Sequence, residues 1–458
     1  MFRFSVRALN RHLFIRHAID TVTKARMPFS FHSSTEKTKM TPLTLDSQSA
    51  PVKFEKTNDR PVESEFFRDG NEFDIRFDVP QIQRLRFTDD VLHGDFAVLA
   101  KLIEQSGPMA AKVQIWVDGA LKQPQGVRLV ELHARLDGEK HIDVVGDIQY
   151  VPGGESAKRD PRLIESMLSA FNQANLDRRS YVLVIGGGAV LDAVGYAAAT
   201  AHRGLRLIRI PTTTLAQGDS GVGVKNAINY FAKKNWLGTF ATPWAVINDA
   251  KILDTLPDRD FRCGFSEAVK VSLLKSSDQF ETLVRNATKI RERDHEVTQQ
   301  ALKHSILLHL QHITRGGDPF EAEMARPLDF GHWSAHKLEP MSGYALRHGE
   351  AVSIGVALDC LYSSRVYHLS REDAHRVVRC LAEIGLPTSH PLLANKTALF
   401  DGLEEFRQHL GGELTITMID QPGSPLDVHE VDYAEMGAAI DELIEISRGE
   451  NAIGREVE

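Results

Sequence analysis

The chain has 458 residues and a formal net charge of -8, and 42% of its residues are hydrophobic and 25% charged. This composition is typical of a globular protein with room for two domains, and it excludes a fibrous or collagen-like chain. The body of the chain has neither a basic run nor a stretch of about 18 consecutive apolar residues, so we expect no nucleic-acid partner and no membrane span.

Three scattered cysteines, Cys263, Cys360 and Cys380, form neither a disulfide framework nor a CxxC pair, which predicts a reducing compartment and a cytoplasmic location. Residues 1–39 contain five arginines and only two acidic residues, a pattern that also suits a mitochondrial transit peptide. A disordered tail ahead of a true start at Met27 or Met40 is the competing interpretation. Residues 40–65 are polar and contain several prolines, so 1–65 is interpreted as an extension and linker.

Within residues 66–246, segments with the hydrophobic pattern of a β-strand alternate with segments that have the pattern of an α-helix. The segments 112–117, 141–145, 181–185 and 205–210 read as strands, and 161–176 and 190–201 as helices. Strands that alternate with helices predict a doubly wound parallel sheet. Three loops are candidates for binding a dinucleotide: the Gly186-Gly187-Gly188 turn with Asp192 behind it, Asp118 after the first strand, and 152–158 with Glu155 and Lys158. The glycine turn alone is equally well a plain strand-to-helix connection.

The next segment, 210–235, combines threonines, glycines, an aspartate and lysines, including Thr212, Thr213, Asp219 and Lys225. Hydroxyl groups and lysines in one loop suit a site that holds a cofactor together with a substrate phosphate. Beyond residue 246 the strand signals mostly vanish, and helical patterns follow at 264–286, 295–314 and 348–366. Residues 247–458 are therefore predicted to form a mainly helical domain, with the active site in the cleft between the two domains.

Three histidines, His332, His336 and His348, lie close together in this second half. On a helix, a spacing of four residues places the first two imidazoles on one face, where they can reach a single metal ion. An open zinc site takes about three protein ligands, and imidazole suits zinc. Alternatively, two of the histidines only satisfy hydrogen bonds in the core. Glu267 and Lys270, three apart on a helix, are by themselves an ordinary surface ion pair; beside the histidines, Glu267 becomes a candidate ligand.

Between about 110 and 425 the chain resembles the sugar phosphate cyclases, the family of 3-dehydroquinate synthase. The motifs are GGGxxxD at 186–192, HRG at 202–204, IPTT at 210–213, DSxxGxK at 219–225, KN at 234–235, LPxRxxRxGxxExxK at 256–270, FGHxxxH at 330–336 and HGE at 348–350. The resemblance implies a Rossmann-like sheet followed by a helical metal-binding domain, a carbon–oxygen lyase that eliminates phosphate from a small sugar phosphate, and a homodimer.

The resemblance also implies the roles of individual residues. The metal ligands are Glu267, His332 and His348, with Zn2+ as the ion and Co2+ as an alternative. The NAD contacts are Asp118, Glu155, Lys158, Gly187, Gly188, Asp192, Thr212, Thr213, Leu215, Lys234 and Thr255. The catalytic residues are Asp219, Lys225, Lys270 and His336, and the substrate contacts are Arg203, Asn235, Arg326, Asp329 and His409. Arg203 is expected to serve the site of a neighbouring subunit.

Departures from 3-dehydroquinate synthase narrow the substrate. That enzyme has an asparagine where this chain has Asp329, and an aspartate there would repel a substrate carboxylate. It also has a lysine for the same carboxylate, whereas the matching stretch 308–312 contains none. GDSGVGVKN at 218–226, GDPFE at 317–321, RPLDFGHWxAHKLE at 326–339 and the segment around His409 resemble the sedoheptulose 7-phosphate cyclases, in particular the 2-epi-5-epi-valiolone synthases. The chain is therefore expected to convert sedoheptulose 7-phosphate, a neutral polyol phosphate, to 2-epi-5-epi-valiolone.

Three other functions compete with this one. The first is that of another cyclase, either 3-dehydroquinate synthase or desmethyl-4-deoxygadusol synthase. The second is that of a metal-dependent polyol dehydrogenase, which would produce NADH and would not need Lys225 and Asn235 for a phosphate. The third is that of an NAD-binding protein without activity, which the presence of all three histidines and Glu267 disfavours.

Overall fold

A computed structural model describes residues 77, 79–231, 233–316, 320, 327–409 and 412–454. The chain from Val79 to Glu458 forms one compact unit. The predictions for residues 1–65 and for Arg326 lie outside the described residues, and only the backbone of His409 is described. No helix in the described ranges is both long enough and apolar enough to cross a bilayer.

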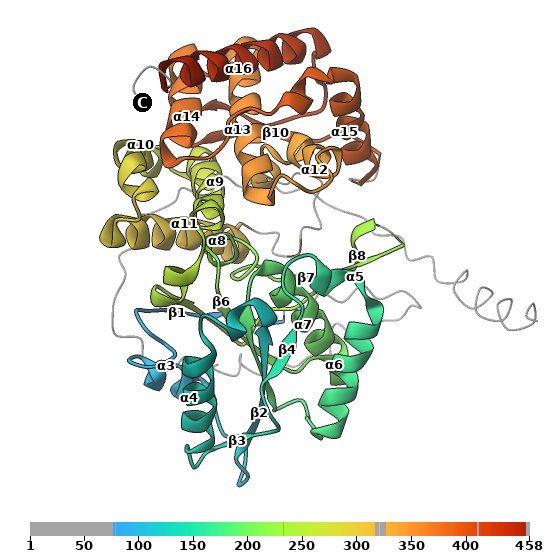
Figure 1. The fold of residues 1–458 in the computed structure, drawn as a ribbon. Coiled ribbons are helices and arrows are strands. Elements are labelled where there is room, and N and C mark those ends of the chain that lie inside the picture. Colours follow the sequence, from blue (N-terminus) through green and yellow to red (C-terminus); the bar gives the residue numbers. More distant parts are fainter. Residues whose placement is uncertain are drawn as a thin grey trace, which may run out of the picture. The chain divides into compact units, whose positions relative to one another are not determined.

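A parallel sheet of seven described strands organises the first half of this unit (Figure 1). Its order is β1-β9-β6-β5-β2-β3, and β4 also pairs with β2. The strands are β1 (Arg84–Thr88), β2 (Ala111–Asp118), β3 (Ile142–Val144), β4 (Gln149–Val151), β5 (Tyr181–Gly186), β6 (Arg206–Pro211) and β9 (Ala245–Asp249). All their pairings are parallel, which confirms the predicted Rossmann-like sheet.

Helices cover both faces of the sheet. Along β5, Tyr181, Leu183 and Ile185 belong to one hydrophobic core and Val182 and Val184 to another. Successive side chains of a strand point to opposite faces, so a strand buried on both faces reads as a continuous apolar run. The covering helices are α6 (Pro161–Gln173) and α7 (Gly188–Thr200) on one face, and α3 (Phe96–Leu102) and α4 (Gly126–Asp137) on the other.

The direction in which the sheet grows reverses between β2 and β5. From β2 the chain continues to β3 on one side, whereas from β5 it continues to β6 on the other. Open α/β sheets bind ligands at the carboxyl ends of the strands next to such a switch point. Here β2 ends at Asp118 and β5 at Gly186, so two of the predicted dinucleotide loops meet at the reversal.

The second half of the unit is mainly helical, as predicted. Its helices are α9 (Asp258–Lys275), α10 (Ser277–Arg291), α11 (His295–Arg315), α12 (His332–Met341), α13 (His348–Val366), α14 (Arg371–Ile384), α15 (Lys396–His409) and α16 (Tyr433–Gly454). The central one is α13, which is buried at every position from Gly349 to Ser363 and packs against α9, α12, α14 and α16.

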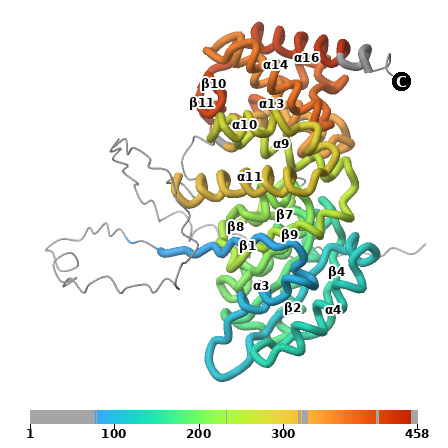
Figure 2. The backbone as a smooth tube through the Cα atoms, turned by 90° about the vertical axis from the view of Figure 1, so that its left-hand side faces the viewer, coloured from blue at the N-terminus to red at the C-terminus, as the bar shows by residue number. Residues whose placement is uncertain are grey.

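Short elements join the sheet to the helices. α8 (Thr214–Gly218) follows β6 and packs on α9 and α11. An antiparallel ribbon of β7 (Lys225–Tyr230) and β8 (Lys233–Phe240) comes next. Figure 2 shows α11 between the strands β7 to β9 and the helices α9 and α10. The segment 210–235 therefore lies where the sheet meets the helices.

One predicted helix was wrong, and some strands lie beyond residue 246, where the strand signals mostly vanish. The single helix predicted at 264–286 is two helices, because Ser276 adopts an extended backbone and its side chain caps α10 by accepting the Gln279 N–H. Strands also continue beyond residue 246, since β9 runs to Asp249 and the hairpin of β10 (Ile416–Gln421) and β11 (Ser424–Val428) lies among the helices.

Candidate active site

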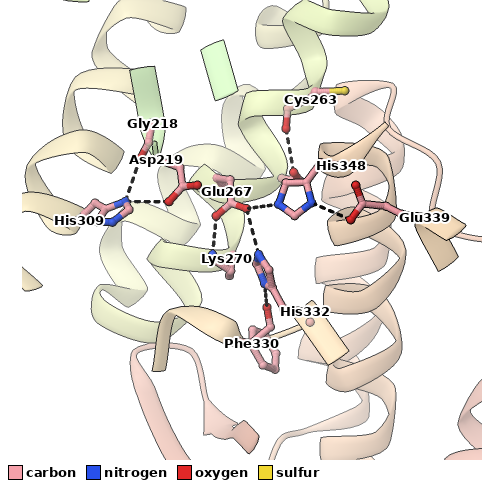
Figure 3. A network of polar contacts seen from close by, with 12 residues as sticks. Gly218, Asp219, Cys263, Glu267, Lys270, His309, Phe330, His332, Glu339 and His348 are labelled. Carbon is pink, nitrogen blue, oxygen red and sulfur yellow. Dashed lines mark hydrogen bonds and ion pairs between the residues drawn. The ribbon is translucent and has the colours of Figure 1, made fainter. Parts of the chain in front are cut away.

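Three predicted ligands converge from three helices. Glu267 is on α9, His332 begins α12 and His348 begins α13 (Figure 3). The Nε2 atoms of His332 and His348 lie 3.6 and 4.0 Å from Glu267 Oε1, and one donor atom from each residue falls within 4.8 Å of the others. Among the described residues, Glu267 Oε1 is a buried oxygen without a hydrogen-bond partner. One carboxylate oxygen and two imidazole nitrogens that face one point fit the donor set of a zinc ion.

Both imidazoles are held through their other nitrogen. His332 Nδ1 lies 3.1 Å from the Phe330 carbonyl oxygen, and His348 Nδ1 lies 3.4 Å from Glu339 Oε2. Because both of these partners are acceptors, each Nδ1 carries the hydrogen and each Nε2 presents its lone pair toward Glu267. Burial, with Lys270 nearby, lowers the pKa of His332 well below its usual value, so the imidazole is neutral and able to bind a cation.

Buried contacts hold the two histidine-bearing helix starts in place. The Asp359 carboxylate on α13 accepts the Gly331 N–H and the Trp333 Nε1–H, both at 2.9 Å, on either side of His332. An ideal Cβ at Gly349 would lie 2.3 Å from the Cys263 carbonyl oxygen. The glycine of the HGE motif therefore lets α13 approach α9 closely.

Lys270 forms a buried ion pair with Glu267. Its Nζ lies 2.5 Å from Glu267 Oε2, and both side chains are only 4% exposed. The alternative interpretation, an ordinary surface pair, does not fit this burial, because α13 and α11 pack over α9. The ammonium group occupies one carboxylate oxygen and leaves the other facing the histidines.

Asp219 and His309 extend this polar cluster. His309 on α11 places Nδ1 3.0 Å from the Gly218 carbonyl oxygen and 3.7 Å from Asp219 Oδ1 (Figure 3). Burial raises the pKa of Asp219, but His309, Lys270 and Lys225 outweigh it and hold the pKa below its usual value. Because burial also lowers the pKa of His309, the two lysines are the charges that remain at neutral pH. Asp219 is therefore ionised beside the lysines.

His336 lies beside the two ligand histidines. Its ring centre is 5.3 Å from that of His332 and 5.9 Å from that of His348, and its side chain is exposed. The predicted convergence of all three imidazoles is thus present, with His336 on the open side.

The three predicted dinucleotide loops lie together at the switch point. An ideal Cβ at Gly153 would lie 2.3 Å from Asp118 Oδ1, so the 152–158 loop passes directly against the Asp118 carboxylate at the end of β2. Gly187 precedes α7, and the helix starts at Gly188, so its N-terminus lies at this glycine turn. A helix N-terminus framed by loops with little side-chain bulk fits a pyrophosphate.

Several predicted cofactor residues contact protein groups. Lys158 Nζ lies 2.6 Å from Asp192 Oδ2, and Glu155 accepts the Asn229 side-chain amide at 2.6 Å. Thr213 caps α8, the Thr212 N–H donates to the Gly186 carbonyl, and Thr255 accepts a hydrogen bond from Gln125 at 3.4 Å. Leu215 lies in the first turn of α8. All of these residues lie on the loops and turns around the switch point or beside it.

Arg209 is a site residue that the sequence analysis missed. It is fully buried on β6, and its guanidinium donates to the carbonyl groups of four residues of the segment 210–235 and to the Asn226 side chain. Those four residues are Ser220, Gly221, Gly223 and Lys225. Burial lowers its pKa to about 10. An arginine between the apolar Ile208 and Ile210, in the middle of a strand, was the available signal.

The β7–β8 ribbon places two predicted phosphate contacts. Lys225 begins β7, and Asn235 lies on β8 with a left-handed backbone (φ 54°) and donates its N–H to Asn229 Oδ1. The neighbouring Lys234 Nζ reaches Glu339 on α12 at 3.1 Å. The ribbon is therefore tied to the helices that carry the histidines.

Two predicted substrate contacts lie differently. Asp329 is half-buried in the short turn Pro327–Asp329 just ahead of His332. Arg203 is exposed beyond the far end of α7, and 13 residues of helix separate this end from Gly188 by about 20 Å. Arg203 is therefore remote from the glycine turn at the start of α7.

Known proteins resemble this chain in sequence. Residues 148–263 match the family model for the 3-dehydroquinate synthase N-terminal domain and residues 264–404 that for the C-terminal domain. A 3-dehydroquinate synthase from Geobacillus thermodenitrificans is 33% identical over 337 residues, which cover 73% of this chain and 89% of that protein.

Solved structures resemble it in fold. A 2-epi-5-epi-valiolone synthase from Streptomyces hygroscopicus subsp. jinggangensis, solved with NAD+ and Zn2+ bound, matches with a TM-score of 0.72 and 25% identity, covering 81% of this chain and 99% of that one. A 2-deoxy-scyllo-inosose synthase complexed with carbaglucose-6-phosphate, NAD+ and Co2+ matches with a TM-score of 0.63 and 21% identity, covering 78% and 96%.

Proposed function

This chain belongs to the 3-dehydroquinate synthase family of phosphate-eliminating sugar phosphate cyclases, and we propose that it converts sedoheptulose 7-phosphate to 2-epi-5-epi-valiolone and inorganic phosphate. The reaction is redox-neutral overall: a ring hydroxyl is oxidised transiently, phosphate is eliminated, the ketone is reduced again, and ring opening with an intramolecular aldol step closes the carbocycle. Its atoms balance as substrate to cyclitol plus phosphate.

This proposal rests on the charges of the residues that are expected to lie near the substrate. Asp329 takes the position where 3-dehydroquinate synthase has an asparagine, and the stretch 308–312 has no lysine. In that stretch His309 faces Asp219, and burial lowers its pKa, so it offers no cation to a substrate carboxylate. An anionic substrate group beside Asp329 would be repelled, whereas a hydroxyl group can donate to it. A neutral polyol phosphate therefore suits the site better than an acidic one. The fold likeness to the valiolone synthase agrees with this.

NAD and zinc are proposed as the cofactors. The glycine turn, Asp118 and the loops at the switch point would hold NAD, and Glu267, His332 and His348 would hold the metal ion, with Co2+ as an alternative. When bound, these groups supply a reversible hydride acceptor and a Lewis acid for substrate oxygens.

The side chains around the ligands would then handle the substrate. Lys270, held by Glu267, and the ionised Asp219 would orient the reacting hydroxyl. His336, exposed beside the ligand histidines, would transfer protons. Lys225 and Asn235 on the β7–β8 ribbon would bind the phosphate.

A homodimer is part of the proposal. Arg203 is exposed and lies roughly 20 Å from the Gly188 end of α7, by the length of that 13-residue helix, and we propose, as the resemblance implies, that it contributes to the site of a second copy. Its guanidinium would there add a second cation for the phosphate.

One assay separates the candidate functions. The zinc-loaded protein is incubated with NAD and one of three substrates: sedoheptulose 7-phosphate, the acidic seven-carbon phosphate of 3-dehydroquinate synthase, or an unphosphorylated polyol. Phosphate release, product mass and NADH absorbance are followed. Phosphate release from sedoheptulose 7-phosphate without accumulated NADH, with a product of the valiolone mass, is expected. Turnover of only the acidic substrate, a desmethyl-4-deoxygadusol mass, or steady NADH production from an unphosphorylated polyol would each contradict the proposal.

Asp329→Asn supplies the matched variant. We expect slower turnover of sedoheptulose 7-phosphate with unchanged zinc content, because Asp329 precedes the ligand His332 without being one of the ligands. Loss of zinc from this variant would contradict the role assigned to Asp329.

A further inference from the structure

Glu339 lies between the ammonium group of Lys234 and the imidazole of His348, which come from different parts of the chain. It is buried, with 6% exposure, two turns after His332 on α12. Lys234 Nζ on β8 lies 3.1 Å from its Oε1 and 3.3 Å from its Oε2. His348 Nδ1 on α13 lies 3.4 Å from its Oε2 (Figure 3). No motif prediction assigned a role to this carboxylate.

Glu339 could in principle bind a metal ion itself, since donor atoms of His336, Glu339 and His348 lie within 4.8 Å of one another. The contacts favour a different role. The ammonium group of Lys234 lies against both carboxylate oxygens, and a divalent cation there would be repelled by it. An ion bound to His348 Nδ1 would also displace the hydrogen that Glu339 accepts.

We propose that Glu339 is a positioning residue for the metal ligand His348, and that its ion pair with Lys234 fastens the β7–β8 ribbon to the metal centre. The inference rests on the proposed metal site. By accepting the Nδ1 hydrogen of His348, Glu339 fixes the tautomer that leaves Nε2 free, and it fixes the plane of the ring. Because the same ribbon carries Lys225 and Asn235, one carboxylate sets the place of both the metal ligand and the phosphate contacts.

Two substitutions of Glu339 separate these roles. Glu339→Ala removes the acceptor of His348 and the partner of Lys234 together. Glu339→Gln retains an amide oxygen that can accept from His348 Nδ1 but loses the negative charge that Lys234 needs. Lys234→Met removes the ion pair and leaves the acceptor of His348 in place. Because Lys234 is also a predicted NAD contact, the affinity of this variant for NAD is measured as well. Glu405→Gln is the matched control, because it removes a different ion pair of α12, the exposed one with Lys337.

Zinc affinity, measured by competition with a chromophoric chelator, is the first readout, together with the visible spectrum of the Co2+-loaded protein. Glu339→Ala is expected to weaken zinc binding about 10- to 100-fold and to change the Co2+ spectrum. Glu339→Gln is expected to restore most of the zinc affinity. Glu339→Gln and Lys234→Met should both raise KM for sedoheptulose 7-phosphate about tenfold, with smaller changes in kcat. Glu405→Gln should change none of these.

The results that overturn the inference are distinct from those that overturn the proposed function. Unchanged zinc affinity and Co2+ spectrum in Glu339→Ala, or two ions bound per wild-type chain, would overturn the positioning role. An unchanged KM in Lys234→Met would overturn the fastening of the ribbon. If Glu267→Gln also left zinc affinity unchanged, the metal site itself would be wrong, and this inference with it.

Discussion

The buried carboxyl group of Asp359 makes the stability of this chain depend on pH. Asp359 is fully buried on α13 and accepts hydrogen bonds from the Gly331 N–H and the Trp333 Nε1–H, which bracket His332. Burial raises its pKa from 3.8 to about 7, although both hydrogen bonds act in the opposite direction. Between these two values the folded state retains a proton that the unfolded state has lost, so stability falls as pH rises through this window.

The size of the effect follows from that window. From pH 5 up to the folded-state pKa of about 7, an interval of about two pH units, the unfolding free energy of wild type falls by about 3 kcal/mol. From there to pH 9 this group causes little further loss. Asparagine does not titrate, so Asp359→Asn removes this slope. The NH2 group of the asparagine faces either the Gly331 N–H or the Trp333 Nε1–H, and loss of that hydrogen bond costs about 1–3 kcal/mol. The variant should therefore be less stable than wild type at pH 5 and close to it at pH 9.

Urea unfolding of the metal-free proteins at pH 5, 7 and 9 measures this difference without a contribution from metal binding. Cys360→Ala is the control. It removes a neighbouring buried side chain whose thiol pKa burial raises well above its usual value, so the thiol stays protonated in the folded state throughout this range. In the unfolded state the thiol ionises only as the pH approaches about 8.5, so the control should lower stability by nearly the same amount at pH 5 and pH 7 and by slightly less at pH 9. A gap between wild type and Asp359→Asn that stayed constant from pH 5 to pH 9 would refute the reasoning.

Three further substitutions test other parts of the site. Arg209→Met leaves the loop carbonyls without their donor, so it should raise KM for the sugar phosphate at least about tenfold and lower the melting temperature, whereas Arg206→Met on the same strand should leave KM unchanged. Lys270→Met leaves Glu267 buried and unpaired; calorimetry should show a loss of about 3–5 kcal/mol in the metal-free protein and a smaller loss after zinc is added. Gly349→Ala places a Cβ 2.3 Å from the Cys263 carbonyl, and urea unfolding should show a loss of about 1–3 kcal/mol.

Much of the sheet could be predicted from sequence because its strands are buried on both faces. Residues 181–185 form a continuous apolar run between a polar loop and a glycine turn, and a run of this length between two turn signals is typical of a buried parallel strand. The β7–β8 ribbon gave no such signal, since most side chains of β8 are exposed. The break at Ser276 was also missed, because the apolar positions of α9 and α10 continue the helical period across it.

Motifs predicted many residues of the site, but the burial and the contact partners of these residues were harder to predict. Motifs named Glu267 and Lys270, but three-residue spacing cannot show that other helices pack over the pair and bury it. Arg209 illustrates the same limit, since the acceptors of its guanidinium come from a loop 11 to 17 residues further along. Such contacts arise from tertiary packing, which leaves no periodic trace in the sequence.

The geometry also bears on the two interpretations of the histidines that the sequence left open. A core histidine uses its nitrogens to satisfy buried partners, so free lone pairs would have no reason to meet. Here each predicted ligand uses one atom for the protein: Glu267 Oε2 binds Lys270, His332 Nδ1 binds the Phe330 carbonyl, and His348 Nδ1 binds Glu339. The second atom of each faces the same point, and the buried Glu267 Oε1 has two imidazole Nε2 atoms at 3.6 and 4.0 Å. Three acceptors turned toward one another repel unless a cation lies between them. We therefore expect a metal-free crystal structure to show these side chains displaced or protonated, and unchanged positions with neutral histidines would favour the core interpretation.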